Sequence, residues 1–178
     1  LKNKQITFKG TGLGDTFLDS ESNEDIEIIF ENMVVKIEDL EFSENVKVNF
    51  INSEVYLNNV SFNDLESSMS SIYGLGNISL KPSSTMDIIK SNLDFEESYL
   101  TLEKSSSSLG FTLIDSKLLL GNASLINKMS GGVGILIDPT SELIIRNGLD
   151  FIGADLLSGI SVNNNGLLVI SGATINSL

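Results

Sequence analysis

The chain has 178 residues, no cysteine and no histidine, and its formal net charge is -13, since 24 acidic side chains outnumber 11 basic ones. Phosphate binding needs clustered Lys and Arg, so this charge argues against nucleic-acid and anionic-lipid partners. Disulfides and thiolate metal sites are excluded, and no apolar stretch approaches the ~20 residues that span a bilayer. We therefore expect one domain, or a segment of a longer repetitive protein, without membrane insertion.

Residues 1–25 differ from the rest of the chain. A short strand is predicted at 5–8, and a glycine-rich, acidic segment follows at 9–25. Part of it, 12–19, is similar to a calcium-binding nonapeptide, and Glu21, Glu24 and Asp25 could add carboxylate oxygens. Such sites need tandem copies, so a solvated acidic loop is the other interpretation. We predict that 1–25 forms an irregular first coil, or the N-terminal edge, of a structure covering 26–178. No cofactor is expected, and calcium is the one ion considered.

From residue 26 onward, one short pattern recurs six times. Its copies end at Phe42, Phe62, Phe95, Leu125, Phe151 and Ile175. Three residues before each end stands a residue that tolerates positive φ cheaply. These residues are Asp39, Asn59, Asn92, Asn122, Gly148 and Gly172. Aligned turn positions of this kind predict stacked coils that bury one continuous core, with the six residues forming a structural turn column.

Each copy is predicted to contain three short strands, the last two separated by the tight bend at the turn column. The Val, Ile, Leu and Phe content and the alternation of apolar and polar residues are strand chemistry. The sequence thus predicts an all-β fold, a right-handed parallel β-helix of about six or seven coils. A leucine-rich repeat and a β-sandwich are the alternatives, although a sandwich gives no reason for aligned turns. Asparagines in the column would hydrogen-bond from coil to coil, or join two solenoids.

The spacing between copies is unequal, and the extra residues fall mostly after the predicted third strand. They occupy 63–76, 96–109, 126–134 and 152–159, where serine runs and glycines are common. We predict that these segments are loops along one edge of the solenoid. Loops on a rigid scaffold often carry the binding function.

The pattern at 141–151, Ser-Glu-Leu-Ile-Ile-Arg-Asn-Gly-Leu-Asp-Phe, resembles the coils of the pectin-lyase-like right-handed β-helix superfamily. Over residues 26–178 the chain is most similar to passenger domains of bacterial autotransporters and polymorphic outer-membrane adhesins. The tetrapeptide 42–45, Phe-Ser-Glu-Asn, matches the F-x-x-N motif of the latter. The resemblance implies a secreted or cell-surface location and a non-covalent recognition role, but specifies no activity.

The same superfamily includes enzymes that degrade polysaccharides. Its hydrolases use a histidine, which this chain lacks, while its lyases use calcium and an arginine as base. Arg146, the only arginine, is thus the one residue considered as a base, with Asp138, Asp150 and Asp155 as possible neighbours; the alternative is a surface arginine paired with carboxylates. We assign no catalytic or metal-binding residue.

Two functions follow as expectations. The first is a non-enzymatic extracellular or cell-surface solenoid, an adhesin segment whose edge loops contact a host or bacterial surface protein or glycan, with self-association as a further possibility. The second is a carbohydrate-binding or carbohydrate-cleaving β-helix, such as a polysaccharide lyase or a phage fibre. Outward-facing aromatic side chains would favour the second, and the only tyrosines are Tyr56, Tyr73 and Tyr99.

Overall fold

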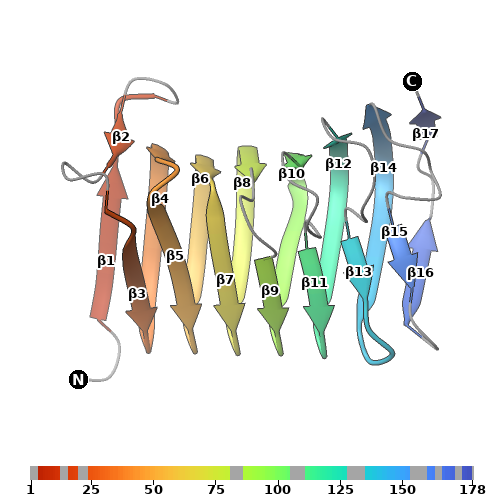
Figure 1. Ribbon diagram of the computed structural model, residues 1–178, viewed down its shortest axis with the longest axis horizontal. Helices are drawn as coiled ribbons and strands as arrows, with labels where there is room; N and C mark the ends of the chain where they lie inside the picture. The colour runs from red at the N-terminus through yellow and green to blue at the C-terminus, as the bar shows by residue number, and fades with distance from the viewer. Residues whose placement is uncertain are drawn as a thin grey trace.

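The computed structural model shows an all-β parallel solenoid in which the chain winds through two parallel sheets (Figure 1). It describes residues 4–12, 16–19, 24–80, 86–104, 111–127, 135–152, 160–162, 166–170 and 174–177. These residues form about five turns, so the predicted count of six or seven coils is not confirmed. No helix long and apolar enough to cross a bilayer occurs within these ranges.

The larger sheet, called the wide sheet here, contains ten strands. They are β1 (Lys4–Lys9), β2 (Phe17–Leu18), β4 (Met33–Phe42), β6 (Glu54–Phe62), β8 (Ser71–Leu80), β10 (Asn92–Lys104), β12 (Lys117–Asn127), β14 (Glu142–Ile152), β16 (Leu167–Ile170) and β17 (Thr174–Ser177). The narrow sheet contains seven. They are β3 (Ile26–Glu31), β5 (Val46–Ile51), β7 (Asp64–Ser68), β9 (Met86–Ile89), β11 (Phe111–Ile114), β13 (Ile135–Ile137) and β15 (Ile160–Val162).

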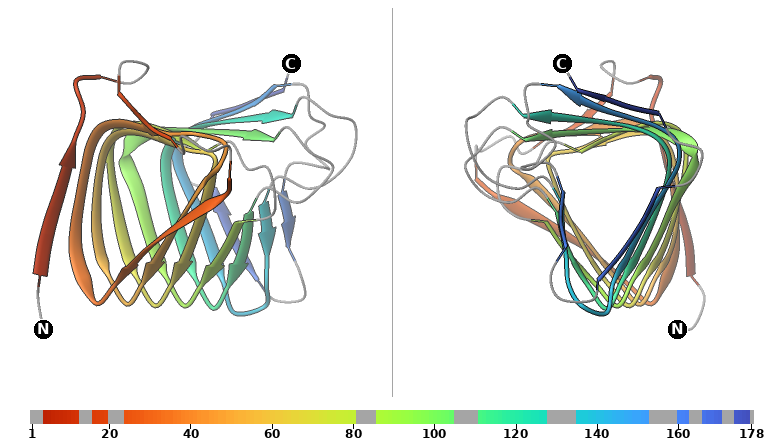
Figure 2. Two further views of the ribbon diagram at one scale, coloured as in Figure 1. Left: turned by 60° about the vertical axis from the view of Figure 1, so that its left-hand side comes forward. Right: turned by 90° about the vertical axis from the view of Figure 1, so that its right-hand side faces the viewer.

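The long strands of the wide sheet bend in the middle, and the bent sheet encloses the core together with the narrow sheet (Figure 2). The predicted coil of three separate strands is not confirmed. The predicted second and third strands form one continuous strand in β4 and in β6, because the bend at Asp39 and Asn59 interrupts the pairing at only one position. The stacking of parallel strands, which the aligned pattern predicted, is present in both sheets, and register shifts occur in the wide sheet where its strands bend.

Aromatic and aliphatic side chains stack inside the coil, one above another. The rings of Phe42 and Phe62 lie 4.8 Å apart between centroids, and those of Phe30 and Phe50 lie 5.4 Å apart. These distances are close to the ~4.8 Å spacing between paired strands, so in-register pairing places like residues in contact. Every coil therefore shares its apolar surface with its neighbours, and the core is continuous along the solenoid.

A row of buried serines lies where each turn leads from the narrow sheet into the wide sheet. It consists of Ser53, Ser70, Ser91, Ser116 and Ser141. Backbone N–H groups donate to the serine hydroxyl of the next coil, at 3.0 Å from Ser53 to Ser70, 3.1 Å from Ser70 to Ser91, 3.0 Å from Ser91 to Ser116 and 3.0 Å from Ser116 to Ser141. The hydroxyls of Ser53, Ser70, Ser91 and Ser116 lie within hydrogen-bonding distance of backbone carbonyls. Buried polar groups are tolerated when they are paired in this way.

The serine row corrects one predicted loop. Residues 63–76 contain a serine run, but they form β7 and most of β8, with Ser67 and Ser70 buried. Polar composition was misleading here, because the serine hydroxyls are paired inside the solenoid. The loop predicted at 96–109 is also wrong for residues 96–104, which belong to β10. Ile126, Asn127 and Ile152 lie in strands, and the rest of the predicted loops falls outside the described residues.

The N-terminal segment is not separate from the solenoid. Strand β1 pairs in register with β4, and β2 pairs with the end of β4. Ile6 and Phe8 pack against the core, and the Phe8 ring meets that of Phe30 edge to face. Strand β1 therefore adds to the wide sheet ahead of β4, and β2 covers the end of β4.

Candidate functional site: the outer face of the wide sheet

Four outward-facing residues form one row across the wide sheet. The register pairs Lys36 of β4 with Tyr56 of β6, Tyr56 with Tyr73 of β8, and Tyr73 with Asp94 of β10. Their chain neighbours on either side, apart from Gly74, have buried side chains, because successive side chains of a strand alternate between the two faces. The row thus presents a cation, two aromatic rings and a carboxylate side by side. We call it the tyrosine row.

The two tyrosines stack on each other and remain open to solvent. Their ring centroids lie 5.3 Å apart at an interplanar angle of 21°. The exposed fraction is 39% for Tyr56 and 42% for Tyr73, which is high for aromatic side chains on a sheet. The ammonium of Lys36 lies over the Tyr56 ring, 5.8 Å from its centroid, within the range of a cation–π interaction.

The hydroxyl of Tyr56 donates a hydrogen bond to Glu54, a carboxylate on the same strand. This hydrogen bond, with a smaller effect from desolvation, raises the pKa of Tyr56 above its ordinary value. The phenol is therefore held in its neutral form, with its ring oriented by its neighbour. No acid–base role follows from this arrangement.

A groove of about 640 Å³ lies on this face around the tyrosine row. Besides Lys36, Tyr56 and Tyr73, its lining includes Gln5, Glu38, Asn58, Leu75 and Glu97. This mixture of aromatic, apolar and polar groups, and this volume, are typical of sites that bind small ligands or side chains. The groove therefore is the strongest candidate for a binding site among the described residues.

Two glycines shape the sheet beside the groove. At Gly74 a Cβ atom would clash with the ring of Phe95, which is fully buried and fills the space next to the glycine. Gly76 has a φ of 69° and lies against Asn59, so it continues the bend in β8. A shift of register in β10 between Asp94 and Ser98 accompanies this bend. Irregularities of this kind commonly redirect side chains at functional surfaces.

The charged groups around the groove are partly paired. Glu38 forms an ion pair with Lys9 at 3.1 Å, and Glu96 forms one with Arg146 at 2.6 Å. Glu97, which lines the groove, is exposed, and within the described part of the chain its carboxylate has no ion-pair partner. The local charge that remains is therefore negative on the β10 side of the tyrosine row.

The predicted turn column is found only in part. Asp39 and Asn59 have φ values of 54° and 52° and lie at the bends of β4 and β6, where Asn59 donates to Asp39 over 3.1 Å. Gly76 occupies the next bend, and the Asn77 N–H donates to Asn59 over 3.0 Å. The coil-to-coil hydrogen bonding predicted for the asparagines is thus present at these positions.

The other residues of the column are placed differently. Asn92 lies outside it, because Asn92 begins β10 and pairs with Ser71 and Lys117 near the start of their strands. Asn122 and Gly148 are in register with each other, but Asn122 is absent from the described residues with positive φ. Gly172 lies outside the described residues. Positive φ occurs instead in the turns between the sheets, at Asn32, Asn52, Met69, Lys90 and Asp115.

Among the described residues, Arg146 forms an ion pair with Glu96, and not with Asp138, the one considered neighbour whose side chain is described. Its guanidinium reaches from β14 across β12 to Glu96 on β10. Gly121 lies against the backbone of Glu96 on the intervening strand, where a Cβ atom would clash. Asp138 instead accepts hydrogen bonds from Thr140 and from the Asp115 N–H. Asp155, and the side chain of Asp150, lie outside the described residues.

Asp138 closes the turn after β13. Desolvation alone would raise its pKa, but hydrogen bonds from Ser141, from the side chain and N–H of Thr140, and from the Asp115 N–H together hold the pKa below its ordinary value. The carboxylate form is therefore stabilised in the folded chain. This residue has a structural role as a turn acceptor.

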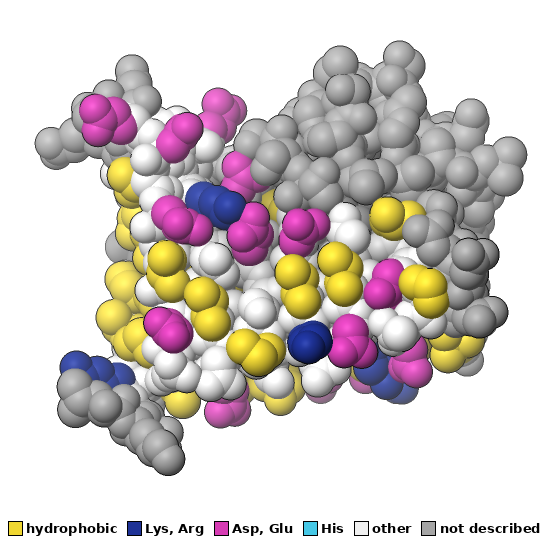
Figure 3. All heavy atoms as spheres, turned by 60° about the horizontal axis from the view of Figure 1, so that its bottom comes forward, with side chains coloured by type: hydrophobic (Ala, Val, Ile, Leu, Met, Phe, Trp, Pro, Cys, Tyr) yellow, Lys and Arg dark blue, Asp and Glu magenta, His cyan; other side chains and the backbone are white. Residues whose placement is uncertain are grey.

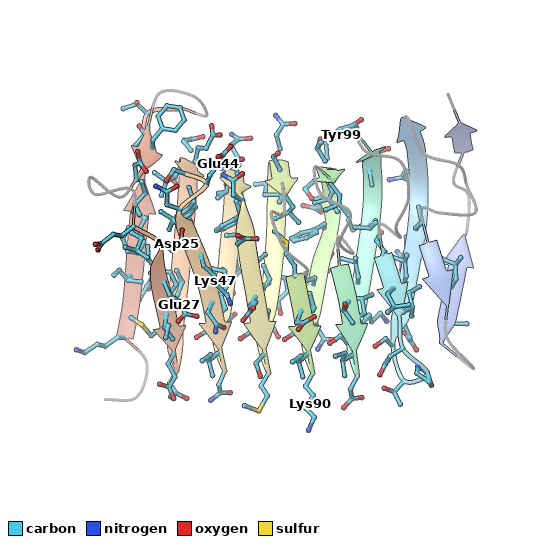
Figure 4. The ribbon with its side chains drawn as sticks, viewed as in Figure 1. Asp25, Glu27, Glu44, Lys47, Lys90 and Tyr99 are labelled. Atoms are coloured by element: carbon cyan, nitrogen blue, oxygen red, sulfur yellow. The ribbon has the colours of Figure 1, made fainter. Side chains whose placement is uncertain are left out.

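Acidic residues also gather on the narrow sheet. Figure 4 shows Asp25, Glu27, Glu44 and Lys47 near one another on β3, β5 and the segments beside them. Lys47 forms a 2.6 Å ion pair with Glu66, and this hydrogen bond, opposed by desolvation and aided by the charges of Glu66, Glu27 and Asp64, raises the pKa of Lys47. A lysine thus neutralises the centre of the cluster.

Within the described ranges, no three acidic side chains are grouped as ligands for a metal ion. The calcium prediction for 9–25 falls in part on residues 13–15 and 20–23, which lie outside those ranges and include Asp15 and Glu21. It stays a prediction.

The lower side of the molecule shows a different surface (Figure 3). Hydrophobic side chains form a broken band there, interrupted by acidic and basic side chains. Among the described residues, the stacked pair of exposed rings lies on the wide sheet, so the band ranks below the groove as a site.

Comparisons with known proteins give the chain no relatives. No protein-family model matches it, and neither a curated protein nor a solved structure is similar enough to be matched.

Sequence reasoning named the three tyrosines but did not place them together. The signal that unites Tyr56 and Tyr73 is the strand register, which the unequal coil lengths hide.

Proposed function

We propose that this chain is a non-enzymatic, surface-displayed binding solenoid, and that it recognises its ligand with the outer face of the wide sheet. The finer fold that goes with this proposal is a right-handed β-helix of three-sided coils, similar to autotransporter passenger segments. Location outside the cell is part of the proposal.

One observation supports this choice of surface above the rest. Two exposed tyrosines stack beside a groove of about 640 Å³ on a rigid sheet. Exposed aromatic rings lose little conformational entropy on binding, and they are enriched where proteins bind partners. The sheet also holds them in register, so the site is preorganised. The edge loops expected from the sequence are a weaker choice, because 63–76 forms strands.

The position of Arg146 supports a binding role over a lyase reaction. Its guanidinium is engaged in a 2.6 Å ion pair with Glu96 on the surface of the wide sheet, where it serves as a surface ion pair. If the chain were a calcium-dependent lyase, unsaturated product would form from polygalacturonate with calcium, and Arg146→Ala would abolish it. We expect no product from either protein.

Carbohydrate binding is the second candidate, and the exposed tyrosines favour it. A sugar ring can pack its C–H groups on an aromatic face while amide and carboxylate groups accept its hydroxyl hydrogens. Asn58, Gln5 and Glu97 line the groove and could serve in this way. The tyrosine row therefore fits either a protein or a glycan ligand.

The test is a binding screen with intact cells and an array of glycans. Tyr73→Leu should reduce binding to any ligand found, whereas Ile29→Thr, which alters an exposed apolar residue on the narrow sheet, should leave it unchanged. Both variants must keep the circular-dichroism spectrum of the parent chain. Binding that is insensitive to Tyr73→Leu would refute the proposed surface.

A further inference from the structure

We propose that the β10 side of the tyrosine row binds a cationic side chain, so that the ligand is a protein segment bearing Lys or Arg. The site consists of the face of the Tyr73 ring that lies opposite Tyr56, with the carboxylates of Asp94 and Glu97. This inference rests on the proposed function, since it names the partner of the same groove.

The order of the row is the first argument. Tyr56 has Lys36 over its ring on one side and Tyr73 stacked on the other, so both of its faces are occupied. Tyr73 has Tyr56 on one face, and its register neighbour on the other side is Asp94. The β10 end of the aromatic pair therefore meets a carboxylate, and no cation from the described residues lies over the Tyr73 ring there.

The aromatic pair already holds one cation, and this shows what it favours. Tyrosine rings attract ammonium and guanidinium groups through their electron-rich faces. Lys36 occupies the β4 side, and the register places Asp94 three strands away on β10. A cation from another molecule at the Tyr73 face would complete a symmetrical arrangement, with a positive charge at each end of the stacked rings.

The carboxylates supply the second half of the site. Glu97 lines the groove, is exposed, and has no ion-pair partner within the described part of the chain. One oxygen of Asp94 accepts the Glu96 N–H at 3.1 Å, and its charge remains available. Arg146 forms its ion pair with Glu96, so this pair does not neutralise the carboxylate of Glu97. An ammonium at Tyr73 would thus lie near two negative charges, that of Glu97 in the lining of the groove and that of Asp94 beside Tyr73 in the strand register.

The overall charge favours the same class of partner. At a net charge of -13, the chain attracts basic segments and repels acidic glycans and phosphates at long range. A neutral sugar would use the rings but gain nothing from Asp94 and Glu97 as charges. A basic protein segment uses both, and the observations therefore favour it.

The experiment measures fluorescence anisotropy of a labelled peptide of alternating lysine and glycine. The same peptide with acetylated lysines keeps the length but loses the charge and should bind much more weakly. Tyr73→Leu should weaken binding of the lysine peptide by about three- to fivefold, whereas Tyr73→Phe, which keeps the ring, should change it by less than about twofold. Asp94→Asn and Glu97→Gln should each weaken it by a similar factor.

The matched control is Glu44→Gln, which removes the same charge from the narrow-sheet side of the molecule. Thermal unfolding of each variant shows that the fold is retained. Equal losses from Glu44→Gln and Glu97→Gln would show a general charge effect and overturn the inference, as would equal losses from Tyr73→Leu and Tyr73→Phe. If the lysine peptide fails to bind while a neutral glycan binds in a Tyr73-dependent manner, the inference is wrong and the proposed function stands. If no ligand responds to Tyr73→Leu, both are wrong.

Discussion

Ser91→Ala removes one hydroxyl from the middle of the buried serine row. Ser91 has an exposed fraction of 1%, and its hydroxyl accepts the N–H of Ser70 at 3.1 Å and lies 2.9 Å from the hydroxyl of Ser67. Without it, the buried Ser70 N–H has no acceptor, which costs about 1–3 kcal/mol, and the Ser67 hydroxyl loses a partner worth about 1 kcal/mol. We expect the free energy of unfolding to fall by about 2–4 kcal/mol.

Ser61 provides the matched control on β6. Its exposed fraction is 3%, and its hydroxyl oxygen has no hydrogen-bond partner among the described residues. Ser61→Ala removes an unpaired polar atom at a buried position, so stability should rise or change by less than about 0.5 kcal/mol. The same substitution thus has opposite expected outcomes at two buried serines.

The assay is urea unfolding followed by circular dichroism, with hydrogen exchange of the Ser70 amide as a local readout. Ser91→Ala should lower the midpoint at an unchanged slope, and the Ser70 amide should exchange faster. The Ser53 amide, which donates to Ser70 rather than to Ser91, should keep its protection better. If Ser91→Ala and Ser61→Ala had equal effects, the serine row would not be stabilising the coils.

Three further sets of substitutions test the bends, the core and a turn. Asn59 has a φ of 52°, which glycine adopts easily and alanine does not. Urea unfolding should therefore show Asn59→Ala to be less stable than Asn59→Gly by about 1 kcal/mol. Phe95→Ala empties a fully buried site and should lower the free energy of unfolding by about 3–5 kcal/mol. Gly74→Ala forces a Cβ atom against the Phe95 ring and should lower it by about 1–3 kcal/mol. Equal stability of the parent chain and Gly74→Ala would contradict this packing. Because hydrogen bonds hold the pKa of Asp138 low in the folded chain, its contribution to stability is present above the unfolded pKa of about 4 and is lost as the pH falls through the lower folded value. Thermal melts between pH 7 and pH 2 should therefore show a smaller acid-induced loss for Asp138→Asn than for the parent chain, and an identical loss would contradict it.

The sequence was informative where local chemistry decides the structure. Asp39 and Asn59 are suited to positive φ, and the apolar alternation around them predicts the inward face, so parallel stacked coils follow from the chain itself. The prediction failed at Asn92, which fits the same pattern but begins a strand. The chain had already turned there, at Lys90 with a φ of 49°, and lysine is no signal for that conformation.

The buried serines show a second case in which amino-acid composition alone could not predict the structure. The run at 67–71 has the polarity of a loop, yet Ser67 and Ser70 are buried because neighbouring coils supply their hydrogen-bond partners. Pairing of this kind is a property of the stack, and one coil cannot reveal it. The tyrosine row has the same origin, since Lys36, Tyr56, Tyr73 and Asp94 are unequally spaced in the chain and meet only through strand register.

In-register stacking of the wide sheet is the claim on which both the fold and the tyrosine row depend. Since the chain has no cysteine, Ser71→Cys with Leu167→Cys gives two unique sites for spin labels. The register links these positions through Asn92, Lys117 and Glu142, which makes four strand spacings, or about 19 Å between backbones at ~4.8 Å each. We predict a narrow distance distribution by double electron–electron resonance near that value, broadened only by the labels. A broad distribution, or one centred beyond about twice that distance, would contradict in-register parallel stacking.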